Sequence, residues 1–441
     1  MNISHFLETV TNEIKSKEAK QYVKVELSQH IQKSKQSWVQ RGYSEIEAEE
    51  KAVKEMGSPI TLGKSLNKLH RPKVDWLLIS LLIVTLLLSF LPIMALNQER
   101  YLDFFNLNFS TMIQNKVIFI IIGLIVAIGI MYFDYRKLKR FGYLFYAAGV
   151  GLIIFLQLFT NSIVNGEQMI SLGGIDIQVW MAIPLFLIAW ASIFSNTSFK
   201  LWHCIGLFAF SIYLFLWIAN LSMLFIYIVI VSVLFLQSKF SRKEKLLVVG
   251  AAAILMVGII IFFTVSYMKG NIAHYQVDRL LGFIAPYEHA SGSGYQYVTL
   301  ENAIKNAGMF GTENIIYIPD ADTILVFGNL IQTYGYALGI VIFVILSAFL
   351  ARIWIILKSI KEPFGKLLII GGATLFATQF LYSVGVTFGL LPLVSITLPF
   401  MSYGLMPTVL NAFIVGLVLS VYRRKHFIQI KREEKDLSSF Q

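Results

Sequence analysis

The side chains that could do chemistry gather in one stretch of this sequence. Between positions 269 and 322 lie six carboxylates, one arginine and two histidines: Asp278, Glu288, Glu301, Glu313, Asp320, Asp322, Arg279, His274 and His289. A carboxylate within reach of a hydroxyl can act as a general base, whereas a carboxylate before a helix can simply cap it. Both interpretations of Asp320 and Asp322 stay open. The two histidines lack metal-ligand spacing, so we expect no protein metal site.

The elements around this stretch are apolar enough to lie in a membrane. Of 441 residues, 56% are hydrophobic and 14% are charged, against about 25% charged residues in soluble proteins. A helical span needs about 20 apolar residues, and the uncharged runs are 76–98, 117–133, 141–166, 177–199, 201–238, 246–268, 323–351 and 367–422. Two of them are long enough for two spans, with turns predicted near 217–220 and in 389–404. We therefore predict an all-α polytopic membrane protein with about ten transmembrane helices.

The first 74 residues differ from the rest, with 13 Lys or Arg and 9 Asp or Glu. Ser44 and Glu47 have the spacing of a capping box before a helix that Gly57 and Pro59 end. We predict a small soluble helical module at 1–74, a membrane domain at 75–425 with a large external loop at 269–322, and a cytoplasmic tail at 426–441. No apolar stretch follows Met1, so we expect the module to stay in the cytoplasm.

Basic residues mark the orientation of the spans. Lys and Arg accumulate in short cytoplasmic loops, and here they cluster after the second, sixth, eighth and tenth spans, at 136–140, 242–245, 352–366 and 423–425. The loops after spans three, five and nine carry none. Both termini are therefore predicted to be cytoplasmic. The net charge of +11 reflects this topology and the membrane surface, and we expect no nucleic-acid partner.

Two external segments are unusual. The loop 269–322 is rich in Tyr and Phe, which disordered segments lack, so we expect it to fold against the outer face. The segment 389–404 is uncharged and contains Pro392 and Pro399. Non-helical backbone at membrane depth is tolerated only where protein or a water-filled cavity surrounds it. We predict that this segment is a partly inserted loop that lines an outward-facing cavity.

The motifs in these segments resemble those of the SEDS proteins (shape, elongation, division and sporulation), the RodA, FtsW and SpoVE group. Gly389-Leu-Leu-Pro392 followed by Leu398-Pro-Phe-Met-Ser-Tyr-Gly404 is similar to the family signature. The long loop adds further matches, and the resemblance covers about residues 75–425. The residues that it marks as substrate-binding are Tyr275, Gln276, Arg279, Gly294, Tyr295, Gln296, Pro392, Pro399, Ser402, Tyr403 and Gly404. The prefix resembles the helical module ahead of some bacterial permeases.

The resemblance implies a peptidoglycan glycosyltransferase in the bacterial cell membrane that polymerises lipid II, the undecaprenyl-linked precursor, in cell shape, division or sporulation. It also implies a class B penicillin-binding protein as partner. No cofactor is expected, and a divalent cation at the pyrophosphate is left open. The family carboxylate corresponds to Ile324 here, so Asp322 is the first candidate for the catalytic base and Asp320 the second. Ser395 also departs from the usual glycine.

Two other functions stay open. A divergent member without catalysis would bind a lipid-linked precursor or scaffold a wall-synthesis complex, and Ile324 at the carboxylate position is its main support. A lipid or small-solute transporter would need ionisable groups inside spans or symmetric broken helices. The long uncharged runs do not favour transport.

Overall fold

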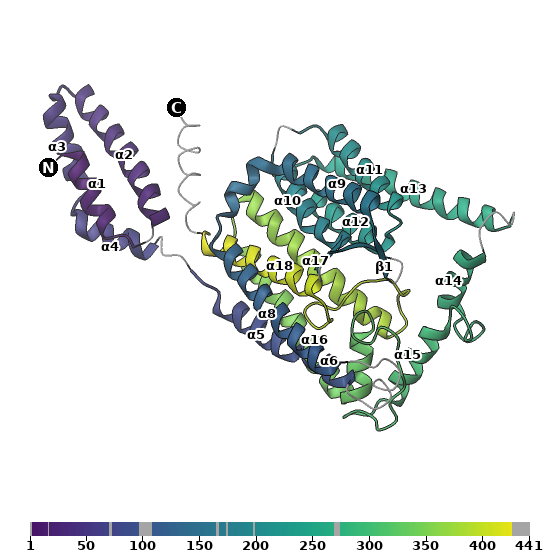
Figure 1. Cartoon of the computed structure of the whole chain (residues 1–441). Helices are drawn as coiled ribbons and strands as arrows, with labels where there is room; N and C mark the ends of the chain where they lie inside the picture. Colours follow the sequence, from purple (N-terminus) through teal and green to yellow (C-terminus); the bar gives the residue numbers. More distant parts are fainter. Residues whose placement is uncertain are drawn as a thin grey trace. The chain divides into compact units, whose positions relative to one another are not determined.

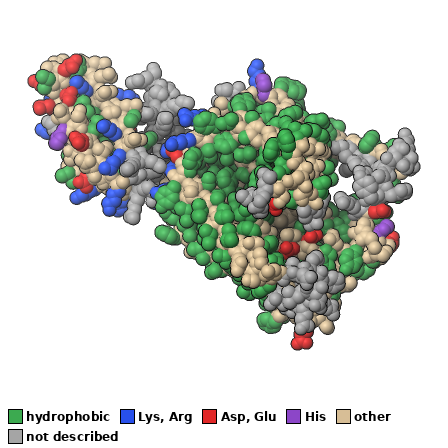
Figure 2. Space-filling view, viewed as in Figure 1, with side chains coloured by type: hydrophobic (Ala, Val, Ile, Leu, Met, Phe, Trp, Pro, Cys, Tyr) green, Lys and Arg blue, Asp and Glu red, His purple; other side chains and the backbone are tan. Residues whose placement is uncertain are grey.

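The computed structural model describes residues 2–15, 17–69, 73–96, 108–164, 167–172, 175–196, 199–268 and 274–425. It contains two compact units, one built mainly from the residues up to Asp75 and one from 76–358 and 363–420 (Figure 1). Charged side chains are dense on the first unit, whereas hydrophobic side chains cover much of the visible face of the second (Figure 2). The tail predicted at 426–441 lies outside the described residues.

The N-terminal unit contains four helices: α1 (Ile3–Asn12), α2 (Lys17–Gln40), α3 (Glu45–Glu55) and α4 (Pro59–Leu69). Their apolar sides share a core that includes the fully buried Phe6, Val10 and Val23. The predicted capping box is confirmed, because the Ser44 side chain accepts from the Glu47 N–H and the Glu47 carboxylate accepts from the Ser44 N–H. The four helices thus bury their apolar sides against one another within this unit, and the solubility of the module stays a prediction.

Helices dominate the second unit. They are α5 (Trp76–Leu88), α6 (Leu91–Leu96), α8 (Phe109–Tyr132), α9 (Gly142–Phe159), α10 (Ala182–Ser195), α11 (Leu201–Trp217), α12 (Leu221–Leu236), α13 (Arg242–Met268), α16 (Val326–Lys358), α17 (Pro363–Thr387) and α18 (Leu405–Arg423). Six helical segments of the described residues are long and apolar enough to cross a membrane. The polytopic, predominantly helical class is confirmed, and the count of ten spans stays a prediction.

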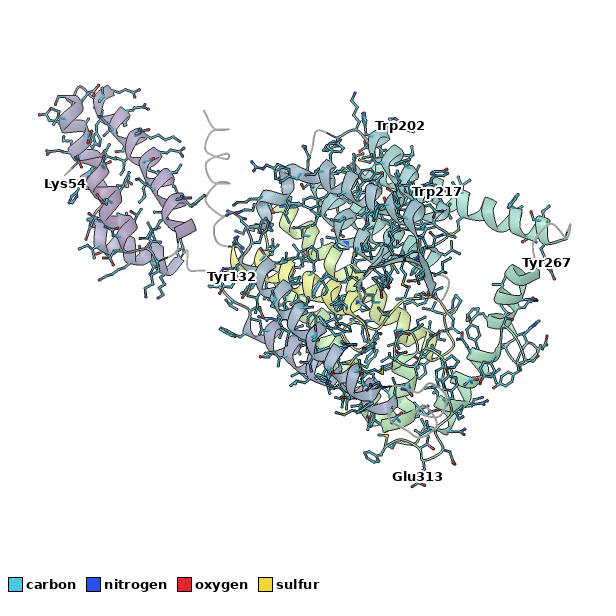
Figure 3. All side chains as sticks on the ribbon, in the orientation of Figure 1. Lys54, Tyr132, Trp202, Trp217, Tyr267 and Glu313 are labelled. Atoms are coloured by element: carbon cyan, nitrogen blue, oxygen red, sulfur yellow. The ribbon has the colours of Figure 1, made fainter. Side chains whose placement is uncertain are left out.

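The predicted turn inside the run 201–238 is confirmed. Helix α11 ends at Trp217 and α12 begins at Leu221, and Ala219 between them has a left-handed φ of 54°. Asn220 caps α12 by accepting a 3.0 Å hydrogen bond from the Met223 N–H. Trp202 and Trp217 lie near the two ends of α11 (Figure 3) and are exposed, as is typical of aromatic residues at the two interfaces of a bilayer.

A small antiparallel sheet was not predicted. Its strands β1 (Ser162–Val164), β2 (Glu167–Leu172) and β3 (Ile175–Gln178) lie in sequence order. The predicted extension of the third span to position 166 and the predicted start of the fourth at 177 are therefore wrong. Asn161 explains the early end of α9: its side chain accepts a 2.8 Å hydrogen bond from the Ser171 N–H and donates to the Ser171 carbonyl. Only β1 and the end of β3 lie inside the predicted uncharged runs, and an apolar run alone does not distinguish such short strands from the end of a helix.

The segment 269–322, which is predicted to be an external folded loop, contains two helices, α14 (His274–Ile284) and α15 (Tyr295–Asn306); its external location stays a prediction. Helix α15 buries Leu300 and Ala303, and the Tyr336 hydroxyl of α16 donates to the Ile304 carbonyl at 2.9 Å. Helix α16 is kinked at Gly335, whose φ is 87°. A Cβ at this position would collide with the Met309 carbonyl, so only glycine allows the backbone of 308–311 to approach.

Candidate functional site

Asp322 lies in an irregular turn rather than in a helix. Helix α16 begins at Val326, three residues later than the predicted span, and the N–H groups of Thr323, Ile324 and Leu325 all point to the Asp320 carbonyl at 3.0–3.1 Å. Asp320 has a left-handed φ of 51°, which an aspartate tolerates better than most residues. Asp322 lies two residues before Ile324, the position that corresponds to the family carboxylate. Two residues at this spacing in a helix would point in nearly opposite directions, but Asp322 and Ile324 precede α16, so this restriction does not apply to them.

The turn is joined to the loop that carries the family signature. The Tyr403 N–H donates a 2.8 Å hydrogen bond to the Asp322 carbonyl. The Ser402 hydroxyl donates at 2.6 Å to the Thr323 carbonyl and accepts at 2.9 Å from the Leu398 N–H. Ser402 is fully buried, so these bonds are shielded from water. The segment 398–404 and the turn 320–323 therefore form one rigid piece of backbone.

A buried lysine fixes the other side of this loop. Lys116 of α8 is 0% exposed, and its ammonium donates to the carbonyls of Phe400 at 3.0 Å and Ser402 at 3.1 Å. Tyr403 lies beside Phe119, one turn further along α8, with ring centroids 5.7 Å apart. Burying a charged group costs free energy unless the group is hydrogen-bonded. The carbonyls of Phe400 and Ser402 supply the acceptors for the Lys116 ammonium.

The carboxylates of the site are electrostatically coupled. Burial raises the pKa of the Asp322 carboxyl, and the nearby charge of Asp320 raises it further. Burial also raises the pKa of the Tyr317 phenol, and the charges of Asp320, Tyr295 and Asp322 add to this effect. Tyr317 therefore lies within electrostatic reach of Tyr295 and of both aspartates, and shifted carboxyl and phenol groups of this kind are typical of functional sites.

The other carboxylates of the segment 269–322 lie elsewhere. Glu313 is exposed and extends away from the ribbon (Figure 3), Asp278 and Glu288 are exposed, and Glu301 forms an ion pair with Lys305 at 2.5 Å. Among the described residues, no three His, Cys, Asp or Glu side chains form a group that could hold a metal ion. Asp320 and Asp322 are thus the carboxylates that the described site offers.

The predicted binding residues fall into three sets. Pro399, Ser402, Tyr403 and Gly404 belong to the loop beside Asp322, and Gly404 has a φ of 135°. Pro392 lies earlier in that loop, where its carbonyl accepts from the Tyr382 hydroxyl at 2.9 Å. Gly294, Tyr295 and Gln296 begin α15. The side chains of Tyr275, Gln276 and Arg279 in α14 lie outside the described ones.

Sequence reasoning missed Lys116 and Tyr317. The predicted run 117–133 begins one residue after Lys116, so the lysine was left outside the span and was not considered. In the structure α8 starts at Phe109, so the lysine lies inside the helix. The assumption that no spanning segment carries an ionisable side chain is therefore wrong. Asn108, which caps α8 by accepting from the Thr111 N–H at 3.2 Å, was the available signal.

An apolar cavity of about 430 Å³ lies among α8, α9, α10 and α18. Its lining follows α18 from Met406, two residues beyond the signature loop, to Ser420, and includes Val126 and Ile130 of α8. Close packing of α8 on α18 forms one wall, since a Cβ at Gly123 would lie 3.2 Å from the Thr408 side chain. The cavity therefore lies along α18, and its lining residue nearest in sequence to the signature loop is Met406.

Residues 75–426 match the FtsW/RodA/SpoVE family model, which is described as "Cell cycle protein". The chain belongs to this family. Membership fits the site just described, in which the signature loop of the FtsW/RodA/SpoVE family is fastened both to α8 and to the start of α16.

Two curated relatives illustrate the similarity. The chain is 30% identical over 161 residues to stage V sporulation protein E of Bacillus subtilis, covering 35% of this chain and 44% of that protein. It is 24% identical over 299 residues to a probable peptidoglycan glycosyltransferase FtsW of Enterococcus hirae, covering 65% of this chain and 74% of that protein. The match thus spans less than half of the first relative.

Two solved structures share the fold. One, from the work titled "Structural coordination of polymerization and crosslinking by a peptidoglycan synthase complex", has a TM-score of 0.66 at 21% identity and covers 80% of this chain and 98% of that chain. RodA of Thermus thermophilus has a TM-score of 0.57 at 19% identity and covers 80% of this chain and 97% of that chain. At such identities the likeness concerns the fold alone.

Proposed function

We propose that this family member is a peptidoglycan glycosyltransferase that polymerises lipid II at the outer face of the bacterial membrane. The observation that carries the proposal is the position of Asp322. Its half-buried carboxyl belongs to a turn whose backbone is bonded to the signature loop through Tyr403. The names of the FtsW relatives support the same activity.

In the proposed reaction Asp322 is the general base. The acceptor hydroxyl gives its proton to the Asp322 carboxylate while its oxygen forms a bond to the anomeric carbon of the donor. The bond from that carbon to the pyrophosphate oxygen breaks, and the undecaprenyl pyrophosphate leaves. A raised pKa suits this role, because a base works best when its pKa approaches the operating pH. In this scheme Asp320 takes no proton from the substrate. Its negative charge repels that of the ionised Asp322 and so raises the pKa of Asp322.

Other parts of the site position the substrates. The cavity among α8, α9, α10 and α18 has the apolar lining that part of an isoprenoid chain needs. Lys116 holds the loop that borders the reacting groups. The charge on the departing pyrophosphate requires cations, and we assign this task to Arg279, with a divalent cation as the alternative.

The partner and the orientation belong to the same proposal. Polymerised strands must be crosslinked, and we propose a class B penicillin-binding protein as the partner. The Lys and Arg clusters at 136–140 and 423–425 support cytoplasmic termini and an external site. The chain is a multi-pass membrane protein under either orientation.

A non-catalytic role is the second candidate, and Ile324 favours it. The resemblance places the family carboxylate at this position, and isoleucine cannot accept a proton. In this alternative the site binds a lipid-linked precursor without reacting, and Asp320 and Asp322 serve to shape the turn before α16.

The deciding experiment is lipid II polymerisation by the purified full-length chain, with and without a class B penicillin-binding protein. We expect Asp322→Asn to lower the rate by at least about a hundredfold, the lower range of general-base catalysis. Glu313→Gln, which removes an exposed carboxylate of the same segment, should leave the rate unchanged. An inactive wild type that Ile324→Asp activates would instead support the non-catalytic role, and full activity of Asp322→Asn would remove Asp322 from the mechanism.

A further inference from the structure

The turn between Gly308 and Gly311 presents two large apolar side chains to its surroundings. Met309 is 58% exposed and Phe310 is 85% exposed, the highest value among the large hydrophobic residues of the described ranges. Gly308 and Gly311 form an isolated β-bridge across the turn, and Gly311 has a left-handed φ of 102°. A Cβ at Gly311 would collide with the Thr333 carbonyl. The two apolar side chains are therefore carried by a turn whose backbone is fixed.

The backbone of this turn completes the hydrogen bonding at the kink of α16. A break in a helix leaves carbonyls of its first part and N–H groups of its second part without helical partners. The N–H groups of Tyr336 and Ala337, the first two residues after the kink, donate to carbonyls of the turn at 3.2 and 3.0 Å. Before the kink, the Gln332 carbonyl accepts at 3.2 Å from the Thr312 N–H. The turn is thus joined to α16 where its second part, 336–358, begins.

The length of this second part indicates its position in a membrane. Residues 336–358 are only slightly more than the roughly 20 residues that cross a bilayer core, and the first charged residue among them is Arg352. Ile340, Val341 and Val344 are 48–56% exposed, as is expected of a helix surface that faces lipid. The beginning of the second part, together with the turn bonded to it, therefore lies at one face of the hydrocarbon layer.

A neighbouring span gives the same level. The Tyr334 hydroxyl donates a 3.3 Å hydrogen bond to the Leu91 carbonyl. Leu91 lies five residues before the end of the apolar segment Trp76–Leu96, which is long enough to cross a membrane. Because a helix rises 1.5 Å per residue, Leu91 is within about 8 Å of the end of that span. Two spans thus place the kink of α16 close to the membrane surface.

Polar residues flank the apolar turn on both sides in sequence. Lys305 and Asn306 precede it, Glu313 and Asn314 follow it, and all four are exposed. No charged residue lies in 307–312. Apolar side chains with charged and polar neighbours are typical of segments that enter only the boundary between lipid headgroups and acyl chains. The composition of this segment therefore agrees with the level of the kink.

We propose that the turn 308–311 is a membrane anchor, whose Met309 and Phe310 side chains insert among the lipids at the membrane face that carries the segment 269–322. Lipid is the occupant because the level of the turn follows from two spans of the same chain. Insertion removes both side chains from water, and the bonds at the kink transmit this attachment to α16. The inference depends neither on the polymerase activity nor on which face of the membrane is external.

Fluorescence quenching in nanodiscs tests the proposal on the full-length protein. Single cysteines from Phe310→Cys, Val344→Cys and Ser291→Cys, each in a Cys204→Ala background, carry an environment-sensitive fluorophore. Ser291 is exposed in the same segment and is the control for water, whereas Val344 is the control for lipid. We expect nitroxide-labelled lipids to quench the labels at Phe310 and Val344 but not the label at Ser291. Iodide in the buffer should quench only the label at Ser291.

A Phe310 label that iodide quenches as strongly as the Ser291 label, without quenching by the lipids, would overturn the proposal. Shielding of that label only after a class B penicillin-binding protein is added would assign the turn to a protein contact instead. A Val344 label without lipid quenching would also overturn it, because 336–358 would then not be a span. Met309→Cys keeps the phenylalanine in place, and its label should behave as the Phe310 label does.

Discussion

The ammonium group of Lys116 donates a 3.0 Å hydrogen bond to the carbonyl oxygen of Phe400, whose own backbone lies in the left-handed region at a φ of 61°. A non-glycine residue in this region costs about 1–3 kcal/mol. Charge-assisted hydrogen bonds contribute about 1.5–3 kcal/mol, enough to offset the strain. The lysine thus stabilises a loop conformation that its sequence alone would not favour.

Replacing this lysine should disorder the site without unfolding the protein. Lys116→Met fills a similar volume but leaves the Phe400 and Ser402 carbonyls without their donor, and each buried unsatisfied acceptor costs about 1–3 kcal/mol. We expect lipid II polymerisation to fall at least about tenfold, since a 1.4 kcal/mol change in barrier is tenfold in rate. Lys200→Met, at an exposed position, is the control. Unchanged activity in the Lys116 variant would contradict the anchoring role.

Glycine at position 335 should be indispensable for the fold of the site. Gly335→Ala combines a φ of 87° with a Cβ collision against the Met309 carbonyl, so we expect a loss of roughly 2 kcal/mol or more in stability. The midpoint of thermal unfolding in detergent measures it. Gly151→Ala, in α9 with no atom within 4 Å of the added Cβ, should be neutral or slightly stabilising. Equal midpoints for the two variants would argue against the kink as a structural requirement.

The pH–rate profile should report the charge coupling between the two aspartates. Burial and the Asp320 charge raise the pKa of Asp322, so the rate should fall with decreasing pH before an ordinary aspartate would be protonated. Asp320→Asn removes the like charge, favours the ionised form of Asp322 and should shift the acidic limb to lower pH. A limb that moves to higher pH, or does not move, would show that Asp320 does not act on the base.

Orientation is tested by cysteine labelling. With the buried Cys204 replaced by alanine, a cysteine at the exposed Ser291 should react with an impermeant thiol reagent on intact cells. A cysteine at the exposed Ser241, beside the basic cluster at 242–245, should react only after the cells are opened. The reverse pattern would place the external segment in the cytoplasm and exclude an extracellular polymerase.

The polytopic helical class was predictable, because the length of an apolar run is a strong signal for a membrane-spanning helix. The turn at 217–220 followed from the same reasoning, since a run of that length exceeds one span. The hairpin from Ser162 to Gln178 was not predicted, because most of it, including Glu167 and Asp176, lies between the two predicted uncharged runs, where such short segments give only a weak strand pattern. Side-chain hydrogen bonds of Asn161 end the helix there, and hydropathy does not register them.

The candidate site was predictable only in part. The motif at 398–404 and Asp322 could be found from residue types and spacing. Their connection through Tyr403 and Thr323 depends on backbone groups, which every residue has and which no sequence pattern distinguishes. Lys116 was missed for a related reason. Its acceptors are two backbone carbonyls far along the chain, so no acidic residue in the sequence pattern indicates that this cation is buried.

The separation of 284 residues between Lys116 and Phe400 has a consequence for biogenesis. Ribosomes add about 5–20 residues per second, so α8 is synthesised many seconds before the carbonyls that accept from its lysine. A lysine at the centre of a spanning helix adds about 2.5–3.5 kcal/mol to the cost of insertion, which is an upper bound for Lys116, the eighth of the 24 residues of α8. During that interval α8 depends on its apolar neighbours, or on the translocation machinery, to remain in the bilayer. Assembly of the site is therefore tied to insertion of the last helix, and a nascent chain lacking α18 cannot yet have it.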